Sequence, residues 1–149
     1  MRATVQRVHE AHVKVDGKIV GAIKTGLLVY VGVAKEDTPA DVAYITEKIA
    51  GLRIFNDAHG KMNRSITDIA GGILVISAFA LQGDARKGRR PSFDPAAGPE
   101  LAESLYHQLC QDLERKHLPV ERGLFRAHMD VASLNDGPIC ILLDSTRTF

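Results

Sequence analysis

The sequence predicts an α/β protein with a single domain, in which a mixed β-sheet or partial barrel packs against two helices. Its 149 residues are the usual size of one domain. Two segments carry apolar residues at helical spacing, and several short segments are rich in β-branched residues. The chain contains no linker, repeat or low-complexity stretch, so residues 1–149 are expected to form one domain.

Three strands are expected near the N-terminus. Residues 5–15 are rich in β-branched residues and are followed by Asp16-Gly17, a pair that tolerates the positive φ angles of a tight hairpin turn. Residues 18–23 would form the return strand. Residues 27–33 are a continuous apolar run, which is typical of a strand covered on both faces. We therefore expect this third strand to be central.

Two helices are expected, each with a recognisable start. Thr38-Pro39 supplies a capping residue and then a proline at the first helical position. The apolar stripe that follows is Val42, Ile45, Ile49 and Leu52. Gly98-Pro99 opens the second helix, which Pro119 ends. Its stripe is Leu101, Leu105, Leu109 and Leu113.

The remaining strands follow each helix. A turn cluster at residues 56–60 and a pair of glycines at 71–72 precede a second buried strand, 73–76, which delivers Ser77 at its end. Residues 120–143 alternate short β-prone runs with a turn at 135–138. The expected element order is therefore βββαβαβββ.

Charge and composition exclude several classes of function. Lys and Arg number 19 and Asp and Glu 18, so a net charge of +1 argues against coating nucleic acid through overall charge. Contact with a polyanion would need a local patch. The two cysteines are too few for a disulfide scaffold. No secretory segment and no apolar run of about 18 residues is present. We expect a cytoplasmic protein that does not enter membranes.

Ordinary catalytic motifs are missing from the sequence. It has no GxSxG elbow, HExxH, P-loop or GxGxxG. Its six histidines are scattered without metal-ligand spacing, and surface or packing roles suit them better. We therefore expect neither a metal nor a cofactor.

Two short stretches could carry chemistry through their backbone. In the first, Ser77, Ala78, Phe79 and Ala80 follow a buried strand, where free N–H groups could point at a ligand oxygen. An ordinary strand end is the alternative. In the second, Gly137-Pro138 lies in a tight turn, which favours a cis peptide bond, and a plain hairpin turn is the alternative.

A basic run is the third candidate. Arg86, Lys87, Arg89 and Arg90 lie together in a loop that Gly88 keeps adaptable. Arginine suits bidentate binding of phosphate. The alternative is an ordinary solvated loop. The closeness of the basic run to Ser77 in the sequence favours a functional role.

Four stretches together resemble the D-aminoacyl-tRNA deacylase family, formerly described as D-tyrosyl-tRNA deacylases. They are residues 3–8 (ATVQRV), 48–55 (KIAGLRIF), 86–93 (RKGRRPSF) and 134–138 (LNDGP). The family hydrolyses the ester that joins a D-amino acid or glycine to the terminal adenosine of tRNA, and it works as a homodimer. The resemblance implies the acceptor end of aminoacyl-tRNA and a second copy of the chain as partners, and neither DNA nor a membrane.

The resemblance also implies a role for Gly137-Pro138. This pair corresponds to the Gly-cisPro element of the family, which enters the active site of the neighbouring subunit. Carbonyl oxygens turned the same way would accept hydrogen bonds from the substrate ammonium and leave no space for an L side chain. A site that works by exclusion makes no selective contact with D side chains, which point outward. It also cannot reject glycine, which has no side chain.

The sequence departs from the family motifs at three positions. Ser77, Phe79 and Leu81 match the motif Ser-Gln-Phe-Thr-Leu, but Ala78 and Ala80 replace its Gln and Thr. Cys140 stands where the motif Asn-x-Gly-Pro-Val-Thr ends in Thr. We favour a substrate-assisted reaction, in which the ribose 2′-hydroxyl helps a water and the N–H of Phe79 or Ala80 stabilises the oxyanion.

Two alternatives remain open at this point. One is a binding module that recognises the tRNA end but has lost turnover along with the Gln and Thr. The other is a nucleophilic hydrolase using Ser77 or Cys140, which would need a base brought close by folding.

Overall fold

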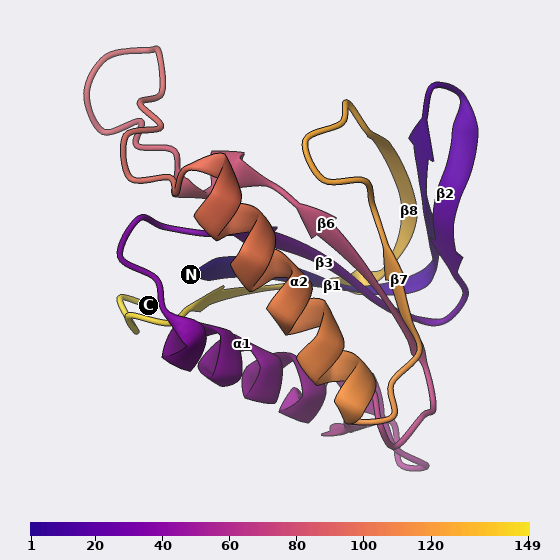
Figure 1. The fold of residues 1–149 in the computed structure, drawn as a ribbon. Coiled ribbons are helices and arrows are strands. Elements are labelled where there is room, and N and C mark those ends of the chain that lie inside the picture. The colour runs from indigo at the N-terminus through magenta and orange to yellow at the C-terminus, as the bar shows by residue number, and fades with distance from the viewer.

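In this computed structural model, which describes residues 1–149, two helices cover one face of a mixed sheet (Figure 1). The strands before the first helix are β1 (Arg2–Val15), β2 (Lys18–Ile23) and β3 (Gly26–Gly32). Then come α1 (Pro39–Gly51), β4 (Phe55–Asn56), β5 (Met62–Arg64) and β6 (Gly72–Ser77). A short 3-10 helix, η1 (Phe79–Gln82), leads to α2 (Pro99–Arg115), β7 (Val120–Arg122) and β8 (Asp130–Asp144).

The predicted order βββαβαβββ is wrong in two places. A small hairpin, β4–β5, lies between α1 and β6, where Asp57 organises the turn by accepting backbone N–H bonds from His59 (2.8 Å) and Lys61 (3.0 Å). At the C-terminus two strands replace the expected three. Strand β8 runs for 15 residues through the predicted turn at 135–138, because shifts in its register with β1 absorb the extra residues as a bulge.

The sheet is mixed, as predicted. Its strand order is β2-β1-β3-β6-β7, and β8 also pairs with β1. Strand β1 is antiparallel to β2, β3 and β8, whereas β3, β6 and β7 are parallel to one another. The turn between β1 and β2 has positive φ at Asp16 (50°) and Gly17 (75°), as expected of that pair. Strand β3 is central and buried.

The sheet curls until β2 approaches β7, which confirms the predicted partial barrel. A side chain at Gly21 of β2 would place its Cβ 2.7 Å from the carbonyl oxygen of Arg122 in β7, so this position requires glycine. The curled face encloses a small apolar cluster. Its members are Val8, Ala11, Val13, Ile23, Leu28, Leu74 and Ile76.

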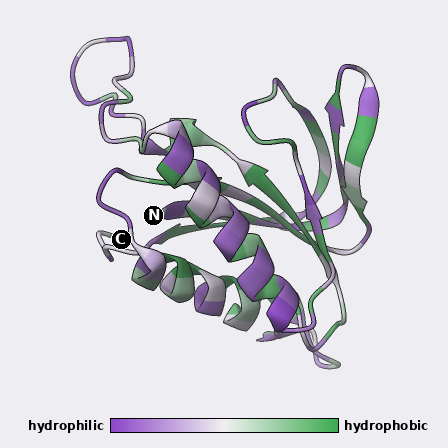
Figure 2. Cartoon of the chain, viewed as in Figure 1, coloured by the Kyte–Doolittle hydropathy of each residue, from purple (hydrophilic) through white to green (hydrophobic).

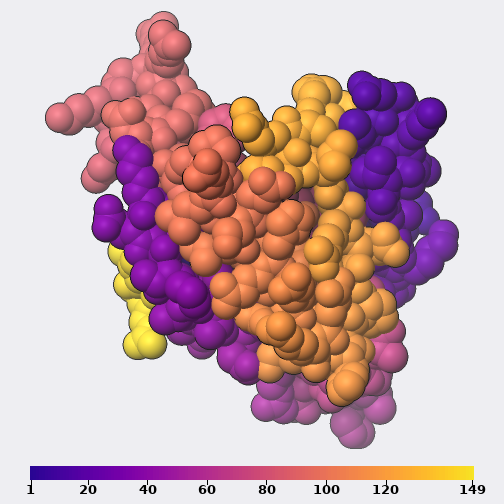
Figure 3. Space-filling view, in the orientation of Figure 1, coloured from indigo at the N-terminus to yellow at the C-terminus, as the bar shows by residue number.

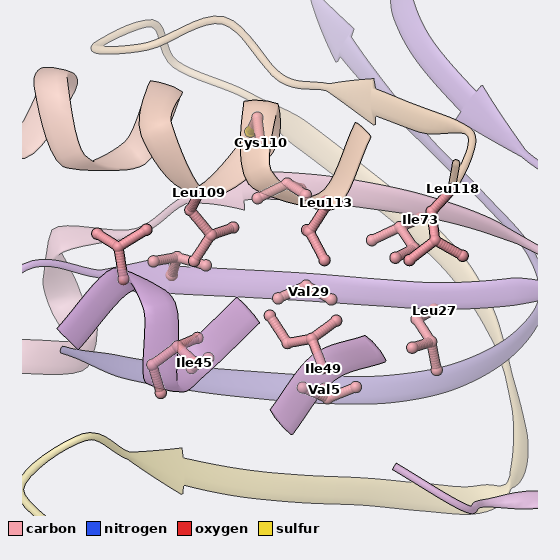
Figure 4. Packing of buried hydrophobic residues seen from close by; sticks show 14 of the residues in the cluster. Val5, Leu27, Val29, Ile45, Ile49, Ile73, Leu109, Cys110, Leu113 and Leu118 are labelled. Carbon is pink, nitrogen blue, oxygen red and sulfur yellow. The ribbon is translucent and has the colours of Figure 1, made fainter. Parts of the chain in front are cut away.

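The larger core lies between the helices and the opposite face of the sheet. Figure 4 shows Ile45 and Ile49 of α1 on one side of Val29 in β3, with Leu109 and Leu113 of α2 on the other; all five are fully buried. The polar side of α2 faces outward (Figure 2). Helix α1 begins after Thr38, whose backbone N–H donates to the Asp41 carboxylate at 2.8 Å. Neither helix has the length and apolar character needed to cross a bilayer.

Candidate functional site

The ends of β3 and β6 and the start of α2 lie at the same side of the molecule (Figure 1). A pocket of about 430 Å³ lies there. Because β3 and β6 are parallel, with Val31 opposite Ser77, both strands deliver their carboxyl ends to the same place. The pocket is lined by Val31, Val33, Ser77, Ala78, Phe79, Ala80, Ala96, Ala97, Pro99, Ala102, Phe125, Arg126, Ala127 and Met129. Segments distant in the sequence therefore meet at this end of the sheet.

The first predicted stretch forms one wall of this pocket. The backbone N–H of Ala78 donates to the carbonyl of Val31 at 2.8 Å, which extends the pairing of β6 with β3 by one residue. The chain then turns into η1, and the N–H groups of Phe79 and Ala80 open this turn. Early N–H groups of a helical turn have no partner within it, so these two are available to a ligand oxygen.

Phe79 gives the pocket an exposed aromatic surface. Its side chain is 61% exposed, which is unusual for a phenylalanine in a domain of this size. Its ring meets that of Phe93 edge to face, with 4.9 Å between centroids. A planar apolar group could stack here without displacing core side chains.

The pocket contains very few polar side chains. Only Ser77 and Arg126 contribute them, and no His, Asp or Glu lines the cavity. Ser77 therefore has no side-chain base beside it in the pocket to raise its nucleophilicity. This arrangement can bind a largely apolar ligand and offer main-chain N–H groups to a developing negative charge.

Gly137 and Pro138 lie apart from this pocket, in the bulge of β8. Both are exposed, and the peptide bond between them is cis. The Asn135 amide holds the bulge at both ends, donating to the carbonyl oxygens of Arg7 (2.8 Å) and Ile139 (3.0 Å). The second predicted stretch therefore does not join the first within one chain.

The side chain of Arg7 contacts the bulge at Asp136. It is buried, and its Nη1 donates to the carbonyl of Ile54 at 2.6 Å. Its Nε lies 3.0 Å from Oδ2 of Asp136, an ion pair without the alignment of a hydrogen bond. The hydrogen bond to Ile54 fixes the Arg7 side chain, and its ion pair with Asp136 then restricts movement of the bulge.

The basic run lies in a loop that extends from the body of the molecule (Figure 3). Arg86 is committed to a partner, because it donates to the Asp84 carboxylate at 2.9 Å and 2.6 Å. These hydrogen bonds hold the pKa of Asp84 well below its ordinary value. Lys87, Arg89 and Arg90 are exposed and make no ion pair within the chain. The loop does not line the apolar pocket.

Sequence reasoning missed part of the pocket. Phe125, Arg126 and Met129 come from the connection between β7 and β8, and Ala97 and Pro99 from the start of α2. Of these, only the Gly98-Pro99 helix start had a sequence signal, and that signal predicted a structural role alone. The positive φ of Arg126, 65°, is a property of the folded backbone that the sequence did not predict.

Comparison with known proteins gives a consistent result. The model of a family described as D-Tyr-tRNA(Tyr) deacylase matches residues 4–144. The chain is 56% identical to the D-aminoacyl-tRNA deacylase of Thermotoga petrophila and 54% identical to that of Anaeromyxobacter dehalogenans, covering 100% of both chains in each case.

Two solved structures are also similar. One, described as the c-Myc DNA unwinding element binding protein, is 38% identical with a TM-score of 0.92 over 97% of this chain and 98% of that one. The other, described as a probable eukaryotic D-amino acid tRNA deacylase, has a TM-score of 0.80 at 17% identity over 95% of this chain and 97% of its own. At that identity the second match shows the fold alone.

The fold and these relatives place the chain in the class of aminoacyl-tRNA deacylases, which are hydrolases. Within that class, the chain belongs to the D-Tyr-tRNA(Tyr) deacylase family. The resemblance seen in four stretches of the sequence is thereby confirmed.

Proposed function

We propose that the protein hydrolyses the ester bond of D-aminoacyl-tRNA, and of glycyl-tRNA formed on a non-cognate tRNA, and so proofreads the amino acid. One observation carries the proposal: an apolar pocket, walled by the backbone of residues 77–80, without a base for a nucleophile. This pocket suits a substrate that brings its own reactivity. An aminoacyl ester is already activated, so positioning and charge stabilisation suffice.

In the proposed reaction, water attacks the ester carbonyl carbon while the N–H groups of Phe79 and Ala80 donate to the developing oxyanion. The ribose 2′-hydroxyl of the terminal adenosine accepts a proton from the water and passes its own to the departing 3′-oxygen. The ester C–O bond then breaks. The products are the free amino acid and a tRNA with an intact 3′-hydroxyl, so no side chain of the enzyme changes its protonation state.

Chirality is read, in this proposal, by Gly137 and Pro138 of a second copy of the chain. Two observations support this: both residues are exposed, and neither lines the pocket of its own chain. Main-chain carbonyl oxygens would accept hydrogen bonds from the substrate ammonium, and the surrounding backbone would exclude an L side chain. A D side chain points away from this backbone and is accepted. Glycine has no side chain, so it is accepted too. The homodimer is thus part of the proposed active state.

Ala78 and Ala80 give the site fewer polar side chains than the family motif has. Neither can supply the amide or the hydroxyl of that motif, so we expect a rate below that of relatives with Gln and Thr. For the same reason a binding module that has lost turnover is the second candidate. A side-chain nucleophile, Ser77 or Cys140, is the third, although neither has an adjacent base in the pocket.

Incubating the purified protein with D-aminoacyl-tRNA, glycyl-tRNA and L-aminoacyl-tRNA separates these functions. We expect hydrolysis of the first two and persistence of the third. No hydrolysis of either would contradict the enzyme. Binding without hydrolysis, with hydrolysis restored by Ala78→Gln combined with Ala80→Thr, would favour the binding module. Excess duplex DNA should leave the rate of hydrolysis unchanged. Sedimentation should show a dimer, and a monomer would contradict an active site shared between two copies of the chain.

A further inference from the structure

Arg126 is the only charged residue that lines the apolar pocket. It comes from the connection between β7 and β8, a different part of the chain from the wall formed by residues 77–80. It is exposed, and it makes no ion pair or side-chain hydrogen bond within the chain. Because the guanidinium of Arg126 has no partner within the chain, its five N–H donors are free for a ligand.

The backbone at Arg126 is in the left-handed region, with φ of 65°. The backbone N–H of Ala127 donates to the carbonyl of Leu124 at 3.2 Å and closes the turn that sets this conformation. Glycine adopts such angles without the clash that a Cβ introduces. The chain therefore carries an arginine at a position where the backbone favours glycine, and residues held this way at a cavity are candidates for function.

Charge decides which part of the proposed substrate this side chain can meet. An aminoacyl-tRNA end carries a positive ammonium on the amino acid and a negative phosphate on the 5′ side of the terminal nucleoside. The guanidinium of Arg126 repels the ammonium and attracts the phosphate, to which it can donate two parallel hydrogen bonds. The rest of the pocket is apolar apart from Ser77, which suits the planar base carried by the ribose that links these two groups.

We propose that Arg126 binds the 5′-phosphate of the terminal nucleotide and so fixes the direction in which the aminoacyl end enters the pocket. This inference rests on the proposed function and adds a residue to its site. It also explains how the terminal nucleotide is held although Ala78 lacks a polar side chain. Arg126 would act inside the pocket, apart from the loop of residues 86–90, which would contact phosphates further along the strand.

The test uses a non-hydrolysable analogue of the substrate end, 3′-D-aminoacylamino-3′-deoxyadenosine, with and without a 5′-phosphate. Calorimetry measures the dissociation constant of each compound. We expect the protein to bind the phosphorylated analogue at least about tenfold more tightly, the size of a hydrogen-bonded charge contact. In Arg126→Gly this preference should disappear, while binding of the unphosphorylated analogue stays within about twofold.

A matched control is available in Arg147. This arginine is also exposed and left-handed, with φ of 58°, and it does not line the pocket. Arg147→Gly removes the same charge and relieves the same kind of backbone angle, so it should keep the phosphate preference. The melting temperature of Arg126→Gly should equal or exceed that of the parent, because glycine suits this turn; loss of preference then cannot arise from unfolding.

The outcomes separate this inference from the function on which it rests. If the parent protein binds neither analogue, the proposed function fails. If it binds both equally, or if Arg126→Gly keeps the phosphate preference, the role of Arg126 is overturned while the proposed function stands. Equal loss of preference in Arg147→Gly would also overturn it, because the effect would then come from overall charge.

Discussion

The side-chain amide of Asn135 donates to the carbonyl oxygen of Arg7 at 2.8 Å, which ties the bulge of β8 to the strand beside it. The same amide reaches the carbonyl of Ile139 at 3.0 Å, beyond Gly137 and Pro138. One side chain therefore spans the segment that we propose to read chirality. Its two N–H donors fix where that segment stands relative to β1.

Replacing Asn135 by alanine removes both hydrogen bonds. We expect the free energy of unfolding in urea to fall by about 1 to 3 kcal/mol, because each bond contributes about 1 kcal/mol and the unpaired carbonyls add a cost. The ratio of D- to L-aminoacyl-tRNA hydrolysis should fall too, because the bulge can then shift. Asn56→Ala is the control, since Asn56 is exposed and its side chain makes no hydrogen bond. An unchanged ratio in Asn135→Ala would show that the bulge needs no such tie.

Side-chain nucleophiles can be tested one at a time. In Ser77→Ala and in Cys140→Ala we expect kcat to fall by less than about tenfold, because the proposed reaction uses main-chain N–H groups and the substrate hydroxyl. Removing a true nucleophile typically costs about 10⁶ in kcat. Single-turnover hydrolysis of D-aminoacyl-tRNA measures the difference. A reduction above about a thousandfold in either variant would assign it the attack.

The basic loop predicts a dependence on salt. Arg89 and Arg90 are unpaired, whereas Arg86 is occupied by Asp84. Arg89→Ala or Arg90→Ala should weaken tRNA binding and reduce the slope of log K against log salt by about 1 for each phosphate that is no longer neutralised. Arg86→Ala should change the slope less. If all three slopes match that of the parent, the loop is a solvated surface only.

Cys110 predicts a decrease in stability at alkaline pH. Burial raises the pKa of its thiol from 9.0 to about 11. Between these values the unfolded chain releases the proton and the folded chain keeps it. The contribution of Cys110 to the free energy of unfolding is therefore fully present below pH 9 and falls as the pH rises, by about 2 kcal/mol at pH 11. Burial also raises the pKa of Tyr106 from its ordinary value of 10.0, so this residue adds a further decrease that begins as the pH passes 10. Urea unfolding from pH 8 to 11 should show a shallower fall in Cys110→Ala; equal slopes would mean that Cys110 does not contribute.

Two leucines of one predicted stripe should behave differently. Leu109 is fully buried, whereas Leu101 at the start of α2 is 37% exposed. We expect Leu109→Ala to cost about 2 to 5 kcal/mol of unfolding free energy, because it removes apolar packing and leaves a cavity. Leu101→Ala should cost under about 1 kcal/mol. Similar costs would contradict the packing described for α2.

That pair also shows how far the sequence predicts the fold. Leucine spacing located α2, and Thr38-Pro39 located the start of α1, because both signals are local to the helix. The spacing could not show that the first leucine of the stripe is partly exposed. Strand β8 was divided wrongly for a related reason. Asn135 to Pro138 have the chemistry of a turn, but pairing with β1 on both sides carries the strand through them.

The site was predictable only where it follows one strand. Ser77 to Ala80 were found because they come directly after a buried run, and in a parallel sheet such ends gather ligands. Arg126 and Met129 reach the same pocket through tertiary packing of another segment, which no local pattern encodes. Their residue types are also ordinary in a surface connection. Arg126 and Met129 could not be predicted because they are distant in sequence from residues 77–80 and no local motif marks them.

Strand β3 contributes to the core along its length and to the pocket at its carboxyl end. Leu27, Val29 and Val31 all belong to the buried core cluster, as does Val33 just past the strand, and Val31 and Val33 also line the pocket. A substitution at Val31 or Val33 would therefore disturb the core and the pocket together, whereas Ala78 and Ala80 line the pocket from outside the core cluster. The pocket can therefore change its chemistry at residues 78 and 80 without repacking of the sheet beneath the helices.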